Sequence, residues 1–246
     1  MRGRGGVTGP AATVPTSARP VVVVMVKAPM PGTVKTRLSP PLSPADAARL
    51  AAAFAQDTVA GLRRIAPALL IAYAPAEGHA ALEHLLSPGL LWTAQRGQDL
   101  GERMEAALAD AHAHGFGPLI VVGTDSPTLP LAFVLEAVSA LRSKQADVVL
   151  GPTDDGGYSL IGVRRPAPGL FDTVAWSTPL AYAQTAANAE RLGLRLHVLP
   201  PWYDIDTADD LARLRREMDA DPAARARAPM TAQWLRSFPE PALFPR

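Results

Sequence analysis

Short apolar runs recur along the chain and are separated by longer stretches in which apolar residues return every three or four positions. The three strongest runs, Val21–Val26, Ala68–Ala74 and Leu119–Val122, have the length and continuity of strands buried on both faces of a parallel sheet. Four weaker runs are further strand candidates: Leu90–Thr93, Asp147–Leu150, Tyr158–Val163 and Leu194–Leu199.

Amphipathic stretches between these runs predict helices. The first begins at Ser43-Pro44-Ala45-Asp46, which offers a capping hydroxyl, a proline at the first helical position and an acid in the first turn. The other predicted helices cover 98–114, 129–143, 179–192 and 207–219. Strands that alternate with helices predict an α/β fold, with a mostly parallel sheet, right-handed crossovers and helices on both faces.

The pattern also divides the 246 residues. Residues 1–19 are rich in Gly, Pro, Thr and Ala and are predicted to be a flexible tail. Residues 20–219 are predicted to form a single α/β domain. From 220 to 246 the chain becomes rich in Pro, Ala and Arg, and a loosely attached C-terminal tail is predicted.

Composition narrows the function. A net charge of +1 gives no global field that would recruit nucleic acid, so any affinity for phosphate must come from a local cluster of cations. The sequence has no cysteine, which excludes thiolate metal sites and cysteine nucleophiles and fits a reducing, cytoplasmic setting. No apolar run approaches the roughly 20 residues of a membrane span. The five histidines form no metal-ligand grouping.

Ligands of such sheets bind beyond the carboxyl ends of the strands, so functional side chains are expected in the segments that follow strands. The first, Lys27–Leu38, reads KAPMPGTVKTRL and contains three cations and a Pro/Gly turn, with Pro29 and Gly32 among its turn residues. Exposed backbone N–H groups beside Lys35 and Arg37 would suit a di- or triphosphate. If the backbone is extended, both side chains project to one side. A solvated basic loop is the alternative.

The second segment follows the Leu119–Val122 strand and contains Asp125. An acid at the end of a buried strand is costly unless it is paired or binds a metal, which makes Asp125 the best candidate metal ligand. The alternative is that Ser126 and Thr128 cap the next helix, with help from Asp125.

Two further acidic segments follow later strands. Asp154 and Asp155 precede two glycines, so they lie either where a ligand approaches closely or on an ordinary hairpin turn, which the local pattern favours. Asp204 and Asp206 alternate ahead of the last predicted helix and could both point to one side. Oxygen ligands of this kind suit Mg²⁺ or Mn²⁺, which retain water and substrate phosphate as further ligands. Capping of the helix is again the alternative.

Five motifs, spread over about residues 20–215, together resemble a bacterial family of nucleotide-diphospho-sugar transferases of the GT-A type. This family is often labelled domain of unknown function 2064, or an arsenosugar-biosynthesis-type glycosyltransferase. The motifs are KAPMPGTVKTRL at 27–38, QDLGERM at 98–104, GTDSP at 123–127, GPTDDGGY at 151–158 and YDIDT at 203–207.

The resemblance implies roles for particular residues. Asp125 and Asp206 would be the metal ligands, for Mg²⁺ or Mn²⁺. The phosphates of the nucleotide would contact the first loop through Lys27, Pro29, Gly32, Lys35 and Arg37. The 97–104 turn, with Leu100, Gly101 and Arg103, would contact the base, although Gln98 stands where the family has glycine. Asp154, Asp155 and Tyr158 would face the transferred or accepting group.

Two enzymatic readings remain open. The likeness favours a metal-dependent glycosyltransferase that moves a sugar from a nucleotide sugar to a small-molecule acceptor. The alternative is a nucleotidyltransferase that joins a nucleoside triphosphate to a phosphorylated or carboxylate acceptor and releases pyrophosphate. Pro127 stands where a glycosyltransferase has the second acid of Asp-x-Asp, which favours the alternative. A binding module without catalysis is disfavoured, because it has no reason to gather several carboxylates.

Overall fold

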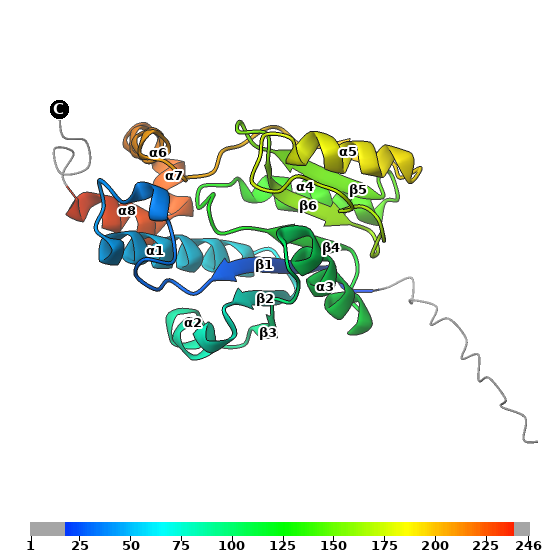
Figure 1. Ribbon diagram of the computed structural model, residues 1–246, viewed down its shortest axis with the longest axis horizontal. Coiled ribbons are helices and arrows are strands. Elements are labelled where there is room, and N and C mark those ends of the chain that lie inside the picture. The colour runs from blue at the N-terminus through cyan, green and yellow to red at the C-terminus, as the bar shows by residue number, and fades with distance from the viewer. Residues whose placement is uncertain (1–17, 239–246) are drawn as a thin grey trace, which may run out of the picture.

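The computed structural model describes residues 18–238 (Figure 1). Most of the tail predicted for residues 1–19, and the last residues of the tail predicted for 220–246, lie outside the described residues.

Seven strands form one sheet in the order β3-β2-β1-β4-β6-β5-β7. Only β6 runs antiparallel to its neighbours, so the sheet is mostly parallel, as predicted. Every predicted strand is present, with the bounds β1 Val21–Lys27, β2 Leu69–Ala74, β3 Leu91–Ala94, β4 Leu119–Val122, β5 Val148–Pro152, β6 Tyr158–Val163 and β7 Leu196–Val198.

The predicted helices are also present, and their caps explain where they begin. The side chain of Ser43 accepts a hydrogen bond from the backbone N–H of Asp46, and Thr207 forms a capping box with Asp210. The short helix α2 was not predicted, because it has a single buried apolar residue, Leu82. The helices between strands are α1 Pro44–Arg63, α2 His79–Leu85, α3 Leu100–Ala113, α4 Leu131–Arg142 and α5 Ala181–Arg191, followed by α6 Ala208–Ala220.

Alternate residues of each central strand enter different cores. Val22 and Val24 of β1 pack into a cluster that includes residues of α1, α2 and α4, whereas Val21 and Val23 pack on the opposite face with residues of α3 and α5. Both faces of β1 are therefore covered, which is why its sequence is continuously apolar.

The tail predicted from residue 220 is wrong up to residue 238. Two more helices, α7 Pro222–Arg227 and α8 Pro229–Ser237, pack against α1 and α6 beside the sheet (Figure 1). Trp234 and Leu235 of α8 are buried in a third apolar cluster with Phe54 of α1. The high Pro, Ala and Arg content reflects short helices that begin with proline and bury small residues, rather than loose chain.

Asp57 fixes this C-terminal unit to α1. Its side chain is buried, one carboxylate oxygen accepts a hydrogen bond from the backbone N–H of Met230 at 2.9 Å, and the other accepts from the N–H and hydroxyl of Thr231, each at 2.7 Å. These donors lie in the first turn of α8, where helical N–H groups have no partner within the helix. An acid inside α1 thus caps a helix at the other end of the chain.

Within residues 18–238, no helix has the length and apolar character that crossing a membrane requires.

Candidate active site

The candidate site lies where the strand order reverses. The chain moves outward from β1 through β2 to β3, and it then returns to place β4 on the other side of β1. In open α/β sheets, ligands bind outside the carboxyl ends of the strands at such a switch point. The loops that follow β1 and β4 therefore meet at the place this architecture provides for a ligand.

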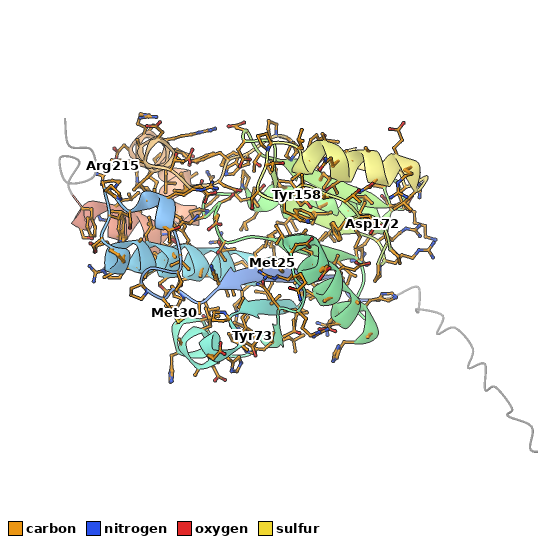
Figure 2. The ribbon with its side chains drawn as sticks, viewed as in Figure 1. Met25, Met30, Tyr73, Tyr158, Asp172 and Arg215 are labelled. Carbon is orange, nitrogen blue, oxygen red and sulfur yellow. The ribbon has the colours of Figure 1, made fainter. Side chains whose placement is uncertain are left out.

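A cleft opens there because β4 is short. Val122, its last residue, pairs with Val24, so β1 continues for three residues without β4 beside it. The resulting cleft has a volume of about 470 Å³. Met25 of β1 and Tyr158 of β6 line it from two strands, and both are labelled in Figure 2.

Lys35 holds the polar side of the cleft together. Its Nζ lies 2.6 Å from an oxygen of Asp125 and 3.0 Å from an oxygen of Asp206, and it donates to the carbonyl of Ile205 at 2.6 Å. Burial acts to lower the pKa of Lys35, but the charges of Asp125 and Asp206 and their hydrogen bonds outweigh it and raise that pKa. The ammonium is therefore charged at neutral pH.

The backbone that presents Lys35 is not extended, so the condition under which Lys35 and Arg37 would project to one side of a strand is not met. Lys35 has a left-handed conformation with φ of 48°, and the next residues form a short 3-10 helix, Thr36–Leu38. Arg37 still reaches the same carboxylate, because its guanidinium lies 3.9 Å from the second oxygen of Asp206. Two cations of one loop thus converge on the site through a turn.

A backbone hydrogen bond brings the two acidic segments together. The N–H of Ile205 donates to the carbonyl of Asp125 at 2.9 Å. The segment that carries Ile205 first runs along β5, where Leu199 and Trp202 donate to the carbonyls of Leu150 and Pro152. Asp125 and Asp206 therefore share a cleft although they are distant in the sequence.

Asp204 lies behind this pair, and its role differs from that of Asp206. It accepts a hydrogen bond from the Ser126 hydroxyl and lines the cleft. Burial raises the pKa of Asp204 to about 6, and the nearby charges of Asp125 and Asp206 add to this, while Ser126 and Lys35 act to lower it. Ser126 thus joins the two acidic segments rather than capping a helix.

A partly buried polar network connects α6 and α7 to the loops that contain Asp125 and Asp204. Glu217 of α6 accepts hydrogen bonds from Thr128 at 2.9 Å and from the Tyr203 hydroxyl. Arg227 of α7 donates to the carbonyl of Thr128 at 3.0 Å and lies 3.3 Å from Glu217. The C-terminal helices therefore support the segments that carry Asp125 and Asp204.

The donor set fits a hard divalent cation bound together with a phosphate. The side chains of Asp125 and Asp206 are 50% and 42% exposed, and both line the cleft. Among residues 18–238 no group of three His, Asp or Glu side chains could hold a metal ion. Mg²⁺ and Mn²⁺ need no such group when water and substrate phosphate complete their ligands. The carboxylates of Asp125 and Asp206 are therefore sufficient protein ligands for such a cation, and Lys35 and Arg37 lie beside them to balance the phosphate charge.

The other predicted residues of the first loop lie around this centre. Lys27 lines the cleft, and its ammonium donates to the carbonyl of Thr33 at 3.0 Å, which spans the loop. Pro29 and Gly32 lie in the turn outside the residues that line the cleft, and Gly32 has φ of 79°, which glycine adopts readily. These two residues shape the loop, whereas Lys27 faces the ligand space.

Asp154 and Asp155 are not among the residues that line the cleft, and their role at the transferred group stays a prediction. Asp154 pairs with Arg213 at 2.6 Å. Asp155 accepts hydrogen bonds from the Thr153 hydroxyl at 2.6 Å and the Gly157 N–H at 3.0 Å, which closes the turn between β5 and β6. The turn between two strands that the local pattern favoured is present. Tyr158, the third residue of that prediction, does line the cleft.

Of the three residues predicted for the 97–104 turn, one lines the cleft and the other two serve the local structure. Leu100 lines the cleft. Arg103 donates to the carbonyls of Gly97 at 3.1 Å and Gln98 at 3.4 Å, so it fixes the turn that precedes α3. Gly101 is buried against Trp176, where an added Cβ would lie 2.7 Å from a ring carbon. Its lack of a side chain serves packing.

Gly101→Ala is therefore expected to destabilise the protein by about 1–2 kcal/mol, since overpacking outweighs the gain in helix propensity. Thermal unfolding measures this change. Gly61→Ala is the matched control, because the added Cβ in α1 meets Leu131 at an ordinary 3.5 Å and should stabilise the helix. Equal shifts of the two melting temperatures would show that Trp176 imposes no constraint.

Several lining residues were not found from the sequence. Gln95 follows β3, and its side-chain amide donates to the carbonyls of Ala72 at 2.8 Å and Val26 at 3.4 Å. Met25 and Met104 form apolar parts of the wall. A polar residue directly after a strand was the available signal for Gln95. Nothing in the sequence distinguishes the two methionines from core residues.

Solved structures and curated proteins show what this architecture is similar to. A crystal structure of a candidate nucleotide-diphospho-sugar transferase from Desulfovibrio desulfuricans is 33% identical, with a TM-score of 0.83, and covers 92% of this chain and 97% of its own. Molybdopterin-guanine dinucleotide biosynthesis protein A from Archaeoglobus fulgidus shares the fold at 15% identity and a TM-score of 0.51, covering 82% of this chain and all of its own.

A curated relative carries a more specific name. The 2-phospho-L-lactate guanylyltransferase of Methanothermobacter thermautotrophicus is 29% identical over 184 residues, which are 73% of this chain and 78% of that protein. The fold and these relatives define the class: the protein is an enzyme, a transferase with the nucleotide-diphospho-sugar transferase fold. The family model described as "Uncharacterized protein conserved in bacteria (DUF2064)" matches residues 47–178, more than half of the chain. The chain belongs to this family.

Proposed function

We propose that this transferase is a metal-dependent nucleotidyltransferase, which joins the nucleoside monophosphate part of a triphosphate to a small acceptor that carries a phosphate or carboxylate. The observation that carries the proposal is the convergence of Lys35 and Arg37 on Asp125 and Asp206 in one cleft. Such a centre suits a substrate with many phosphate charges and a divalent cation. The likeness to a guanylyltransferase supports guanosine triphosphate as the donor.

In this proposal, Asp125 and Asp206, which both line the cleft, would hold Mg²⁺ or Mn²⁺. When bound, the cation supplies charge neutralisation for the phosphates. Lys27, Lys35 and Arg37 bind phosphate oxygens, and Asp204 and Ser126 hold the two acidic segments in register. An oxygen of the acceptor attacks the α-phosphorus, the bond between the α-phosphorus and its bridging oxygen breaks, and pyrophosphate leaves with that electron pair.

Glycosyl transfer is the second candidate, and a separate observation favours it. The relative that covers 92% of this chain is described as a nucleotide-diphospho-sugar transferase. The absence of a second acid after Asp125, where Pro127 stands, argues against it. Its predicted acceptor residue, Asp155, is also held within a turn outside the cleft.

One experiment separates the two activities. Purified protein with Mn²⁺ is given each of four nucleoside triphosphates together with phosphorylated hydroxy acids, including 2-phospho-L-lactate, and pyrophosphate release is followed. The proposal expects release that depends on one triphosphate, on the acceptor and on the metal, with guanosine triphosphate preferred. A parallel panel of nucleotide sugars is assayed for free nucleoside diphosphate. Turnover in that panel alone would replace the proposal with glycosyl transfer.

A further inference from the structure

The ammonium of Lys35 occupies the space between the two carboxylates to which the proposed function assigns a metal ion. Its three acceptors are Asp125 at 2.6 Å, Asp206 at 3.0 Å and the carbonyl of Ile205 at 2.6 Å. A lysine ammonium has three N–H donors and no more. In this arrangement every donor is used, so Lys35 has none left for a phosphate.

The burial of the three side chains shows how they are layered. Only 5% of the Lys35 side chain is exposed, whereas about half of the Asp125 side chain and of the Asp206 side chain is exposed. Lys35 uses one oxygen of each acid, and the second oxygen of Asp206 faces Arg37 at 3.9 Å. The ammonium thus neutralises the carboxylates from the inner side, and any cation that arrives from the cleft meets the same pair.

The Lys35 ammonium and a divalent cation compete for the two carboxylates because both are positively charged. Two carboxylates carry two negative charges, and Lys35 already balances one of them. A divalent cation within bonding distance of the same oxygens would lie close to the ammonium, where repulsion between the two is strong because little water separates them. The ammonium and the divalent cation are therefore alternative partners of Asp125 and Asp206.

We propose that Lys35 is an internal counter-ion of the metal site, which neutralises Asp125 and Asp206 when no divalent cation is present, leaves them when one binds, and then uses its freed donors on the substrate phosphates. This inference rests on the proposed function, since it requires both the metal site and a phosphate ligand. It gives the enzyme an order of events: Lys35 becomes available to phosphate only after the carboxylates have taken up the cation.

The local backbone is suited to such a release. Lys35 is left-handed, with φ of 48°, a conformation that costs a residue other than glycine free energy and persists when its contacts hold it there. The ammonium contacts help to hold it, together with a backbone hydrogen bond that the Lys35 carbonyl accepts from the N–H of Leu38 at 2.9 Å. The long side chain has enough rotatable bonds to move its ammonium from the carboxylates toward the cleft without moving the sheet.

The first test measures Mn²⁺ binding to the full-length protein without nucleotide, by the electron paramagnetic resonance signal of free Mn²⁺. Lys35→Met is expected to bind Mn²⁺ about tenfold more tightly than the wild type, because the competing charge is gone. An affinity that is unchanged or weaker would overturn the proposal, since it would mean that Lys35 does not compete or that it helps to build the site.

Two lysines provide matched controls. Lys27→Met removes the same charge from the same loop, but its ammonium bonds to the carbonyl of Thr33 and not to a carboxylate. Lys144→Met removes a lysine that is also left-handed, with φ of 59°, at the end of α4. Both should change Mn²⁺ affinity by less than about twofold, which is the scale of a screened surface charge. A tenfold gain in Lys27→Met as well would overturn the specific role of Lys35.

The second test uses the wild-type protein, so it does not depend on how a variant folds. A lysine-reactive acylating reagent is applied under limiting conditions, and modification at each lysine is quantified by mass spectrometry. Lys35 should react several-fold faster after Mn²⁺ is added and should be protected again by Mn²⁺ with inorganic pyrophosphate, while Lys144 stays constant. A Lys35 reactivity that does not respond to Mn²⁺ would overturn the proposal.

These measurements separate this inference from the proposed function. If the wild type binds Mn²⁺ and transfers nucleotide while Lys35 responds in neither test, the counter-ion role fails and the transferase assignment stands. If both tests succeed but no triphosphate is consumed, the counter-ion role is supported and the nucleotidyl assignment fails. If neither the wild type nor Lys35→Met binds Mn²⁺, both proposals are overturned.

Discussion

Replacing Asp125 with alanine is expected to lower kcat roughly a thousandfold, the scale seen when a preorganised group that stabilises transition-state charge is removed. Asp125 contributes an exposed carboxylate oxygen to the proposed metal site and is one of the three acceptors of Lys35. Its loss would affect both the cation and the position of the ammonium. Metal-dependent pyrophosphate release, measured with saturating triphosphate and acceptor, gives the comparison with the wild type.

Asp154→Ala is the matched control for this experiment. Asp154 is also an exposed acid in a loop at a strand end, and its sequence motif resembles a site at the transferred group, but the structure pairs it with Arg213 outside the cleft. Its replacement should leave kcat within about twofold, since exposed ion pairs contribute little. An Asp154→Ala variant as inactive as Asp125→Ala would show that the catalytic centre has been placed in the wrong part of the molecule.

The largest expected effect on stability comes from Asp57→Ala. This change leaves the backbone N–H groups of Met230 and Thr231 and the Thr231 hydroxyl without an acceptor in a buried position. The expected cost is about 3–4 kcal/mol of the free energy of unfolding, from several unsatisfied donors at once. For a chain of this size, the melting temperature should fall by roughly 10 °C. Differential scanning calorimetry measures it.

Asp57→Asn separates the shape of the side chain from its charge. The amide keeps one acceptor oxygen for the α8 N-terminus but directs N–H donors toward Thr231, so an intermediate loss of stability is expected. A fall of less than about 2 °C in Asp57→Ala would mean that α8 is not held to α1 by this contact.

The sequence predicted the central part of the sheet well because the strands there are buried on both faces. Val21–Val26 is continuously apolar, and a run of that kind has few alternatives to a central parallel strand. Asp125 and Asp206 were predicted as site residues by their position, since each follows a strand or precedes a capped helix at the carboxyl edge of the sheet, and both line the cleft. The end of a strand can be recognised from the neighbouring residues alone, so the position of these acids could be predicted from the sequence.

What could not be predicted depends on contacts between distant segments. The pairing of Lys35 with Asp125 and Asp206 requires a left-handed turn and the bond from Ile205 to the Asp125 carbonyl, and neither leaves a local pattern. The same holds for α8, whose N-terminal acceptor, Asp57, lies on α1. Asp155 shows the opposite case: a motif likeness suggested chemistry, while the hairpin turn alone accounts for its contacts.

The sequence predicted the fold better than it predicted the transfer reaction. The GT-A likeness placed the fold correctly, and the curated guanylyltransferase relative favours the alternative activity over glycosyl transfer. Pro127 was the one local sign of this, because it removes the second acid of a glycosyltransferase motif.

The backbone hydrogen bond from Ile205 to Asp125 has a consequence for folding during synthesis on the ribosome. The strands β1 to β4, with Lys35 and Asp125, are synthesised early, but Asp206 follows much later, and the helix after it is supported through Glu217 and Arg227 by α7. A nascent chain can therefore form most of its sheet while its reactive centre stays incomplete. In the proposed function, the centre is complete only when Asp206, which lies between β7 and α6, has been added to the chain.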